Sequence, residues 1–549
     1  MKRELFQHDE FFKNKEKTLG QYFTPKFVAE FMVSLITKPK EALILEPCAG
    51  TGIFLSVLYN AGFRNIDAYE IDTNLPNHSP IKVVYQDFLK VRPEEKYDVI
   101  IGNPPYVRWK NILDDWKKMF QESTYWNRIM NGLSDLTYAF IYHSVNMLKK
   151  NGELIFITPI FWTETVHGTR LRNHLIERGH LELLINFNEM HIFKEVSSTI
   201  IIFKYVKSKS NNLSKIVNLH SKEPLTINHI KKVKELIDRL KGNEKYIKEG
   251  IYEAFTHTQP RDGEPWRFTP EIILEHNPLL FLKPSSMLFP EKKFSLLGEI
   301  AEIGNGMVSG LDKVFQLSIA ELNNLTREEV RHVIYVYKAS TLDRFFPKEK
   351  PIPYIYINDV ENEEDLKSNY PHFYEKLRPY KDQLLKRYNY GRNIPWWHWV
   401  FPRNKHLFEN YEEKIFVPSK ERYDTRGYFR FAYVKGVYYA TQDVTVICPK
   451  STFKEGIMYL LALLNSKPYQ EYIVYRGFTR GGVYDFSEKP LASIPILRIN
   501  WNNANEIKLY EEIIKTARDI VMKGLSETLM KELNDIVQKM IRYARDIMF

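Results

Sequence analysis

The chain has 549 residues, which is too many for one ordinary hydrophobic core, so we expect at least two domains. Its hydrophobic fraction of 44% and charged fraction of 27% are normal for a soluble globular protein, and no apolar run is long enough to predict a membrane span. The net charge of +10 is compatible with a polyanionic partner, and equally with a slightly basic enzyme that has none.

Residues 20–205 alternate predicted strands with predicted helices. A helix is expected over 25–38, with Thr24 as its N-cap and Pro25 at its first position. Further helices are expected from 53, over 136–150 and up to 179, and strands at 43–45, 65–72, 82–88, 97–106, 152–159, 181–187 and 198–205. Because these strands are near-continuous apolar runs, we expect an α/β fold with a doubly wound, mainly parallel, Rossmann-like sheet.

The composition changes after residue 205. Residues 207–215 are polar and loop-like, 224–249 form a charged helical stretch, and 250–292 are rich in proline and polar groups. We interpret 206–292 as a connector. Residues 293–549 are rich in Tyr, Trp, Arg and Lys and predict a mixed α+β domain, with a helical, charged tail over 503–549. The predicted organisation is therefore a first domain over 1–205, a connector over 206–292 and a second domain over 293–549.

A glycine-containing turn, EPCAGTG (46–52), follows the first expected strand and opens a helix. Backbone N–H groups at such a turn can approach a cofactor, although a pair of glycines is as often only a tight turn. Glu70 stands at the end of the second strand, about 20 residues further on, where a carboxylate can accept hydrogen bonds from ribose hydroxyls. This pairing favours a ribose-bearing cofactor over a merely solvated carboxylate.

The third expected strand ends at Asp87 and Phe88, which belong to the same edge of the sheet. Ligands bind at the carboxyl ends of strands in open α/β sheets. Asp87 can accept a hydrogen bond from the amino group of a bound adenine, and Phe88 can cover its ring. A two-residue pattern alone is weak evidence for a binding site. The position of Asp87 and Phe88 at the end of a strand is what supports the assignment.

The motif Asn103-Pro104-Pro105-Tyr106 follows the fourth strand and is the sharpest signal in the chain. An adenine amino nitrogen is a poor nucleophile because its lone pair is delocalised into the ring. Two acceptors, the Asn103 side-chain oxygen and a Pro104 carbonyl held rigid by Pro105, would draw that nitrogen toward a tetrahedral shape. Tyr106 offers a flat face on which a base can stack, whereas the alternative is a plain strand-terminating turn.

These motifs resemble, in linear order, those of the gamma-order (Taq-type) adenine-N6 DNA methyltransferases. The matching segments are Thr24-Pro25 within GQYFTPKFVAEFMVSL, EPCAGTGIF, YEID (69–72), QDF (86–88), NPPY (103–106), GELIFITP and HIFKEVSSTIIIF (191–203). The resemblance covers about residues 18–205. Segments 297–315, 416–447 and 459–496 resemble a Taq-type target-recognition domain more diffusely.

The resemblance implies S-adenosylmethionine as the cofactor and assigns roles to the matching residues. The residues that it places at the cofactor are Thr24, Glu46, Pro47, Cys48, Gly50, Gly52, Glu70, Ile71, Asp87, Phe88 and Asn103. The residues that it places at the target base are Asn103, Pro104, Pro105, Tyr106 and Phe193, with Phe193 stacked on the face opposite Tyr106.

The expected function is a site-specific DNA adenine-N6 methyltransferase, of the restriction–modification or solitary kind, that acts on an adenine extruded from duplex DNA. An RNA or protein-amide target is the alternative, since NPPY also serves such enzymes, but the large second domain favours DNA. Cytosine N4 methylation is chemically open. Too few residues precede the first motif for a fused nuclease domain, and the intact motifs speak against a specificity subunit without catalysis.

The expected partner is double-stranded DNA with a specific short recognition site, together with a separate restriction endonuclease that shares the site. Candidate contacts to phosphates or base edges are Arg387, Arg392, Arg403, Lys420, Arg422, Arg426, Arg476 and Arg480. Trp396, Trp397 and Trp399 can line a cleft, although at least two of them are expected in the core. We expect a cytoplasmic monomer without a metal or a membrane partner, because Cys48 and Cys448 lack metal-type spacing and the N-terminus lacks a signal-peptide core.

Overall fold

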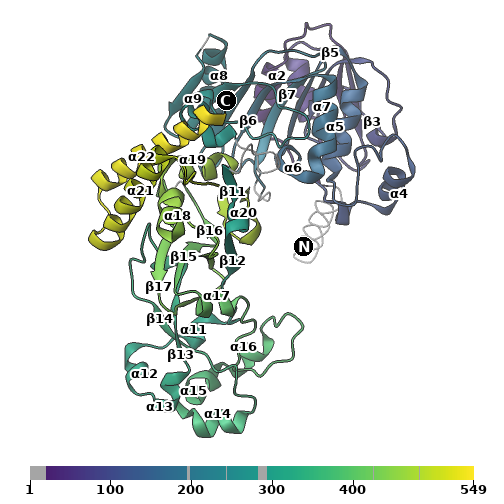
Figure 1. Cartoon of the computed structure of the whole chain (residues 1–549). Coiled ribbons are helices and arrows are strands. Elements are labelled where there is room, and N and C mark those ends of the chain that lie inside the picture. The colour runs from purple at the N-terminus through teal and green to yellow at the C-terminus, as the bar shows by residue number, and fades with distance from the viewer. Residues whose placement is uncertain are drawn as a thin grey trace. The chain divides into compact units, whose positions relative to one another are not determined.

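The computed structural model describes residues 20–193, 198–242, 244–281, 293–423, 426–480 and 482–548. The chain divides into two compact units, the first ending at Ile273 and the second beginning at Leu274. The first unit carries one large sheet, and the second carries several small ones (Figure 1). The short helix α9 (Glu271–His276) spans the division.

Across its described residues, the first unit is built on a ten-stranded sheet in the order β3-β2-β1-β4-β5-β7-β6-β8-β10-β9. Its strands are β1 (Ile44–Glu46), β2 (Ile66–Glu70), β3 (Val84–Tyr85), β4 (Tyr97–Gly102), β5 (Leu148–Pro159), β6 (His180–Asn186), β7 (Ile200–Val206), β8 (Ser214–Leu219), β9 (Tyr246–Glu249) and β10 (Tyr252–His257). Strands β3, β2, β1, β4 and β5 run parallel to one another, whereas β7 is antiparallel to both β5 and β6. The predicted α/β, Rossmann-like sheet is therefore confirmed, with its antiparallel strands on the β5 side.

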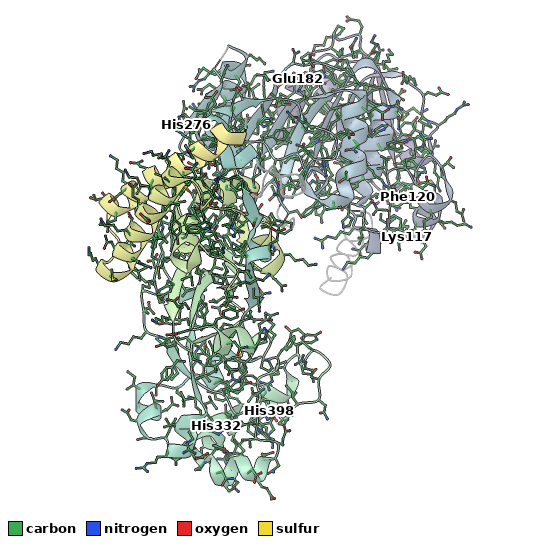
Figure 2. The ribbon with its side chains drawn as sticks, viewed as in Figure 1. Lys117, Phe120, Glu182, His276, His332 and His398 are labelled. Carbon is green, nitrogen blue, oxygen red and sulfur yellow. The ribbon has the colours of Figure 1, made fainter. Side chains whose placement is uncertain are left out.

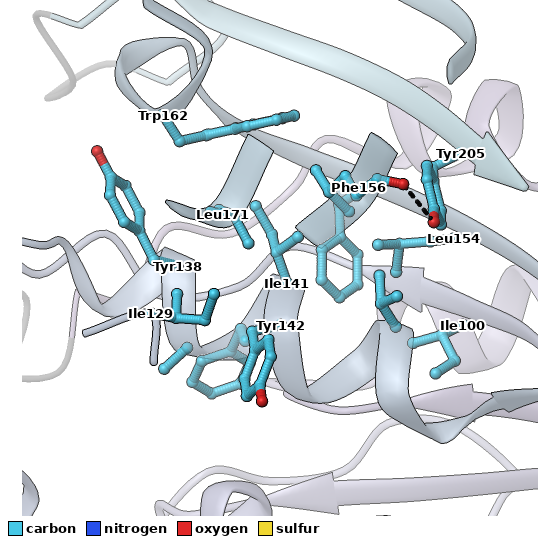
Figure 3. Packing of buried hydrophobic residues seen from close by; sticks show 14 of the residues in the cluster. Ile100, Ile129, Tyr138, Ile141, Tyr142, Leu154, Phe156, Trp162, Leu171 and Tyr205 are labelled. Atoms are coloured by element: carbon cyan, nitrogen blue, oxygen red, sulfur yellow. Dashed lines mark hydrogen bonds between the residues drawn. The ribbon is translucent and has the colours of Figure 1, made fainter. Parts of the chain in front are cut away.

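Helices cover both faces of this sheet. They are α2 (Lys26–Ser34), α3 (Ile53–Asn60), α4 (Asp114–Glu122), α5 (Leu136–Met147), α6 (Phe161–Glu164), α7 (Thr169–Arg178), α8 (Ile227–Lys241) and the 3-10 turns η1 (Phe88–Lys90), η2 (Trp109–Asn111) and η3 (Val166–Gly168). Leu154 and Phe156 of β5 pack against Ile141 of α5 and Leu171 of α7 (Figure 3), while Ile155 packs in the other layer, with residues of α2, α3 and α8. Successive side chains of β5 point to opposite faces of the sheet, and helices cover both faces. Leu154, Ile155 and Phe156 therefore all have buried side chains, which explains why this part of the strand is a continuous apolar run.

The segment predicted to be a connector, 206–292, differs in the structure, because most of it belongs to the first unit. Strand β8 pairs with β6, and β9 and β10 extend the sheet further. Helix α8 buries Ile230, Val233 and Leu236 against a face of the sheet and exposes its charged side chains. Helix α8 is amphipathic, and its many charges lie on one solvated face. These charges are the reason that the sequence favoured a connector here.

Two local predictions shift by a few residues. Helix α2 begins at Lys26 with Pro25 as its N-cap, so Thr24 lies outside the helix instead of capping it. The third strand is only two residues long and exposed, and the chain turns at Asp87. Both shifts have consequences for the site, because they release the side chains of Thr24 and Asp87 for other partners.

The second unit is a mixed α+β assembly, as predicted for the segment after residue 293. Its strands are β11 (Phe294–Leu296), β12 (Ala301–Asn305), β13 (Val333–Tyr337), β14 (Ile352–Ile355), β15 (Glu413–Pro418), β16 (Lys420–Glu421), β17 (Ala432–Lys435), β18 (Tyr439–Ala440), β19 (Val444–Pro449), β20 (Thr479–Arg480), β21 (Val483–Asp485) and β22 (Pro495–Leu497). They form sheets in the orders β12-β19-β15-β17, β14-β13-β18, β16-β21-β20 and β11-β22.

Helices surround these small sheets. They are α10 (Leu297–Ile300), α11 (Asp312–Phe315), α12 (Ile319–Asn323), α13 (Arg327–Arg331), α14 (Glu363–Asn369), α15 (Pro371–Leu377), α16 (Lys381–Lys386), α17 (Lys405–Asn410), α18 (Gly456–Asn465), α19 (Lys467–Arg476), α20 (Glu488–Ala492), α21 (Ala504–Lys523), α22 (Glu527–Met548) and the 3-10 turns η4 (Pro278–Phe281), η6 (Ala339–Thr341) and η7 (Arg378–Tyr380). The predicted helical tail is the pair α21 and α22, which pack against each other (Figure 1).

The three tryptophans of the WWHW segment are core residues of the second unit. Trp396, Trp397 and Trp399 are all buried, and the indole N–H of Trp399 donates to the Ile355 carbonyl at 2.9 Å. His398, which Figure 2 labels, is buried among them and its Nε2 lies 2.7 Å from the Val360 carbonyl. The prediction that at least two of these tryptophans are core residues is therefore confirmed.

In the part of the chain that the structure describes, no helix is both long enough and apolar enough to cross a membrane.

Candidate active site

The candidate site lies at the carboxyl ends of β1, β2 and β4. Strand β1 is in the middle, pairing in parallel with β2 on one side and β4 on the other. The strand order reverses at this position, and such a switch point leaves a crevice beyond the strand ends where ligands bind. Glu46, Glu70 and Asn103, which end or follow these strands, therefore come together although they are distant in sequence.

The glycine turn after β1 has the backbone that its sequence requires. Gly50 and Gly52 have positive φ values of 55° and 84°, a conformation that glycine adopts without steric cost. A Cβ on Gly52 would lie 2.5 Å from the Asn77 side-chain oxygen, so this position also excludes a larger residue. The Gly50 N–H donates to Glu70 at 2.7 Å and fixes the turn against the end of β2.

Two buried carboxylates flank this turn. Glu70 accepts hydrogen bonds from the backbone N–H groups of Gly50 at 2.7 Å and Asp72 at 2.8 Å, and burial raises its pKa. Glu46 is 1% exposed, and its pKa lies well above the ordinary value because of burial and, next, the negative charge of Glu70. Among the described residues, Glu46 Oε2 has no hydrogen-bond partner. The pair is therefore set to receive a cationic or hydroxyl-bearing ligand.

Asp87 and Phe88 lie on another side of the site and form a wall there, separate from the glycine turn and its two carboxylates. The Asp87 carboxylate accepts hydrogen bonds from the Leu89 N–H at 3.0 Å and the Trp116 indole N–H at 2.8 Å. Phe88 is buried, with its ring 5.4 Å from that of Phe140. Trp116 comes from α4, which Lys117 and Phe120 mark in Figure 2. The wall is thus aromatic, with one carboxylate at its rim.

The Asn103 side chain is held in one orientation. Its NH₂ group donates to the Tyr22 carbonyl at 2.7 Å and to the Thr24 hydroxyl at 3.2 Å. A carbonyl can only accept, so the NH₂ group must face Tyr22 and the oxygen must point the other way. Asn103 Oδ1 is buried and has no hydrogen-bond partner among the described residues, although a buried acceptor without one is costly. It is therefore available to a ligand.

Aromatic rings gather beside this amide. The Tyr106 hydroxyl donates to the Ile157 carbonyl at 3.1 Å, which anchors the ring in the layer of α2 and α3. The Tyr22 ring is stacked on Tyr106, with centroids 5.4 Å apart and planes at 28°. Phe193 meets Tyr106 edge-on, with centroids 6.2 Å apart and planes at 69°. The three rings form an aromatic cluster beside Asn103, and of these rings only Tyr22 lines the cavity described below.

These groups line one open cavity of about 650 Å³, its mouth included. The predicted residues that line it are Pro47, Cys48, Gly50, Glu70, Ile71, Asp87, Phe88, Asn103 and Pro105. The predicted residues that do not are Thr24, Glu46, Gly52, Pro104, Tyr106 and Phe193. The lining residues that the sequence did not single out are Gly20, Gln21, Tyr22, Phe23, Leu75, Gln86, Trp116 and Phe140.

This fold and this site define a Rossmann-like methyltransferase. The matching family models are N-6 DNA Methylase over residues 6–65, Eco57I restriction-modification methylase over 56–193 and TaqI-like C-terminal specificity domain over 366–496. The chain is 38% identical over 539 residues to the type II methyltransferase M.HindII of Haemophilus influenzae, covering 96% of this chain and 98% of that protein. It is 37% identical over 531 residues to M.HincII of the same species, with 96% and 98% covered.

The chain therefore belongs to the Taq-type family of type II DNA methyltransferases of restriction–modification systems. A solved structure, that of the type IIL restriction-modification enzyme MmeI in complex with DNA, matches 98% of this chain and 74% of that chain with a TM-score of 0.57. At 11% identity, this likeness concerns the fold alone.

The family implies S-adenosylmethionine as the methyl donor, and the residues of the cavity fit it. This molecule carries a sulfonium and an ammonium group, a ribose and an adenine. In the cavity lining, the carboxylate of Glu70 suits the hydroxyls and the aromatic wall at Phe88 suits the adenine. Glu46 does not line the cavity but interacts with Glu70, and its unpartnered oxygen suits a cationic group.

Proposed function

We propose that this DNA methyltransferase modifies the N6 amino group of an adenine within one short, specific site in duplex DNA. The observation that carries the proposal is the Asn103 amide: both donors are tied down, and its buried oxygen has no partner among the described residues. A buried acceptor beside aromatic rings suits an exocyclic amino group on a flat base.

The two acceptors that this chemistry needs are found on one loop. Asn103 Oδ1 would accept one amino hydrogen and the Pro104 carbonyl the other, which would draw the nitrogen toward a tetrahedral shape and free its lone pair. The flanking carbonyls are already engaged, because that of Asn103 accepts from the Cys48 thiol at 3.1 Å and that of Pro105 from the Thr137 hydroxyl at 2.9 Å. Within the described residues, no donor reaches the Pro104 carbonyl.

The residues of the chain supply positioning and electrostatics. S-adenosylmethionine supplies an activated methyl group on a sulfonium, so transfer needs no covalent enzyme intermediate. Glu70 would bind the ribose hydroxyls, Asp87 the adenine amino group, and Phe88 the adenine ring. Pro47, Cys48, Gly50 and Ile71 would line the same ligand, and Glu46 would face its cationic end.

The target base would enter the pocket beside Tyr106 and Phe193. Extruding a base from the duplex costs a few kcal/mol, which stacking on aromatic rings offsets. The face of Tyr106 is covered by the Tyr22 ring at 5.4 Å, so the incoming base would take the place of that ring. Thr24 would act indirectly, because it helps to orient the Asn103 side chain through a hydrogen bond.

We propose that the second unit reads the DNA, and the basic loop (residues 386–393) is its best candidate surface. No Asp or Glu occurs between Asp382 and Glu409. Lys386 and Arg392 are exposed, and within the described residues neither has a carboxylate partner. Tyr388 is 75% exposed and Tyr390 45%, so aromatic faces and uncompensated charge occur together.

Two arginines of this region donate to backbone carbonyls, and one of them, Arg387, belongs to the basic loop. Arg387 donates to the Ser309 carbonyl at 2.7 Å and also to those of Trp396 and His398. Arg403 donates to the Gly306 carbonyl at 2.8 Å. These two arginines, with Arg476 on the Leu280 carbonyl and Arg426 beside Glu421, are engaged within the protein. Arg392 is exposed and its guanidinium lies 3.7 Å from the centre of the Phe401 ring, and Lys420 is also exposed. The side chain of Arg480 lies outside the described part.

Replacing Lys386 and Arg392 together by alanine is expected to weaken duplex DNA binding about tenfold or more at moderate salt. It should also lower the slope of log Kd against log [NaCl] by about 1.8, since each lost phosphate contact removes about 0.9. Titrations at four salt concentrations measure both. The matched control is Lys348→Ala with Lys435→Ala, because these exposed lysines already have carboxylate neighbours, Glu349 and Glu412. An unchanged slope for the first pair would reject the basic loop as a DNA surface.

The experiment that tests the function is methylation mapping. The chain is expressed in a bacterial host without adenine methylation, and the genome is sequenced by a method that detects modified bases. N6-methyladenine at one recurring motif is the expected result. N4-methylcytosine, or an unmodified genome together with methylated RNA or protein amide, would overturn the adenine assignment. We further propose that the enzyme acts as a monomer and shares its site with a separate restriction endonuclease.

A further inference from the structure

The backbone of the Asn103–Tyr106 loop is attached to the first turn of helix α5. The Leu136 N–H donates to the Val107 carbonyl at 2.8 Å. The Thr137 hydroxyl donates to the Pro105 carbonyl at 2.9 Å, and Thr137 is 2% exposed. No sequence motif for the site includes α5, yet this helix sets the position of the carbonyl that follows Pro104.

The Thr137 hydroxyl has one hydrogen and two acceptors. Asp135 Oδ1 lies 2.8 Å from Thr137 Oγ1, and the Pro105 carbonyl lies 2.9 Å from the same atom. Asp135 is also the N-cap of α5, since it accepts the Thr137 N–H at 3.0 Å. The hydroxyl hydrogen is therefore shared in a three-centre arrangement that joins the helix cap to the loop.

Asp135 itself contacts the loop. Asp135 and Arg108 form an isolated antiparallel bridge. Burial raises the pKa of the Asp135 carboxylate to about 6, whereas the Thr137 and Val107 N–H groups and the Arg108 charge lower it. Above that pH the carboxylate can only accept, so the Thr137 hydroxyl is the donor that stands between two oxygens. The other titratable groups close enough to interact with Asp135 are Tyr106 and Tyr138.

We propose that Thr137, oriented by Asp135, is a positioning residue for methyl transfer. This inference rests on the proposed function of the Asn103–Tyr106 loop. Without the hydroxyl, the Asp135 carboxylate and the Pro105 carbonyl would face each other as two buried acceptors with no hydrogen between them. Their repulsion would move the loop, and with it Asn103 Oδ1 and the Pro104 carbonyl. A shift of about 1 Å in such groups can cost about 100-fold in rate.

The test compares Thr137→Val with Thr137→Ser. Valine has the same shape as threonine but no hydroxyl, while serine keeps the hydroxyl and loses a methyl group. In single-turnover methylation of unmodified DNA, Thr137→Val is expected to be about 30-fold slower. Its dissociation constants for S-adenosylhomocysteine and for DNA should change less than about threefold, whereas Thr137→Ser should return the rate to within about threefold of the wild type.

The matched control is Thr516→Val in the second unit. Thr516 is likewise buried, and its hydroxyl donates to a backbone carbonyl, that of Glu512, at 2.9 Å. It should lose stability without losing rate per folded molecule. A wild-type rate for Thr137→Val, or a Thr137→Ser variant as slow as Thr137→Val, would overturn the positioning role. Failure of the proposed function would look different, because the wild-type enzyme would then leave DNA unmodified.

Discussion

Replacing Asn103 by alanine is expected to lower the single-turnover methylation rate about 100- to 1,000-fold, the size of effect found when one preorganised polar group is removed from a reacting centre. The amide oxygen is buried, without a partner among the described residues, and fixed in direction by two hydrogen bonds on its nitrogen. The interaction with the amino group strengthens as the lone pair is freed, so the loss should appear in the rate and not in binding. Rapid-quench measurements with radiolabelled cofactor, at saturating cofactor and DNA, give this rate.

The chain offers a matched control in Asn465. This residue is also buried, its NH₂ group donates to the carbonyls of Phe431 and Leu461, and its Oδ1 has no partner in the described part of the chain. Asn465→Ala removes the same kind of buried amide from the second unit and should lower Tm while leaving the rate per folded molecule within about threefold. If Asn103→Ala kept the wild-type rate, or if both variants lost rate equally, the catalytic assignment would be wrong.

The sequence predicted the parts of the site that depend on local pattern. Glu70 ends β2, Asp87 comes shortly after β3 and Asn103 follows β4, and parallel strands place their carboxyl ends at one edge of the sheet. The fold, the family and the cofactor follow from this pattern and agree with the comparisons. The individual residue roles remain predictions.

The parts that could not be predicted depend on contacts between distant segments. Trp116 reaches Asp87 from helix α4, and nothing in its local sequence distinguishes it from a core tryptophan. Tyr22 supplies a carbonyl to Asn103 and a ring to Tyr106, but within the matching segment the sequence singles out only Thr24 and Pro25. The strands β8 to β10 were interpreted as a connector because short strands with charged neighbours have a weak periodic signal. Such features follow from tertiary packing, which overrides local preference.

Replacing Glu70 by alanine is expected to weaken the binding of S-adenosylmethionine about 100-fold, with little effect on the rate at saturating cofactor. A hydrogen bond to a charged group contributes about 1.5–3 kcal/mol, and each 1.4 kcal/mol is tenfold in Kd. Glu70 also accepts the N–H groups of Gly50 and Asp72, so its loss would loosen the glycine turn as well as remove the ribose contact. Both effects act on cofactor affinity.

Isothermal titration of the free enzyme with S-adenosylhomocysteine measures the cofactor affinity of each variant. Comparing two substitutions of Glu70 separates the lost ribose contact from the loosened glycine turn. Glu70→Gln keeps one side-chain oxygen as an acceptor, so it should fall between the wild type and Glu70→Ala in affinity. The control is Asp67→Asn, which changes a carboxylate on the same strand that faces Lys96 and Tyr97 instead of the cavity. An unchanged Kd for Glu70→Ala would reject the ribose role. A slow variant with normal affinity would instead place Glu70 with Asn103, among the groups that act only in the transition state.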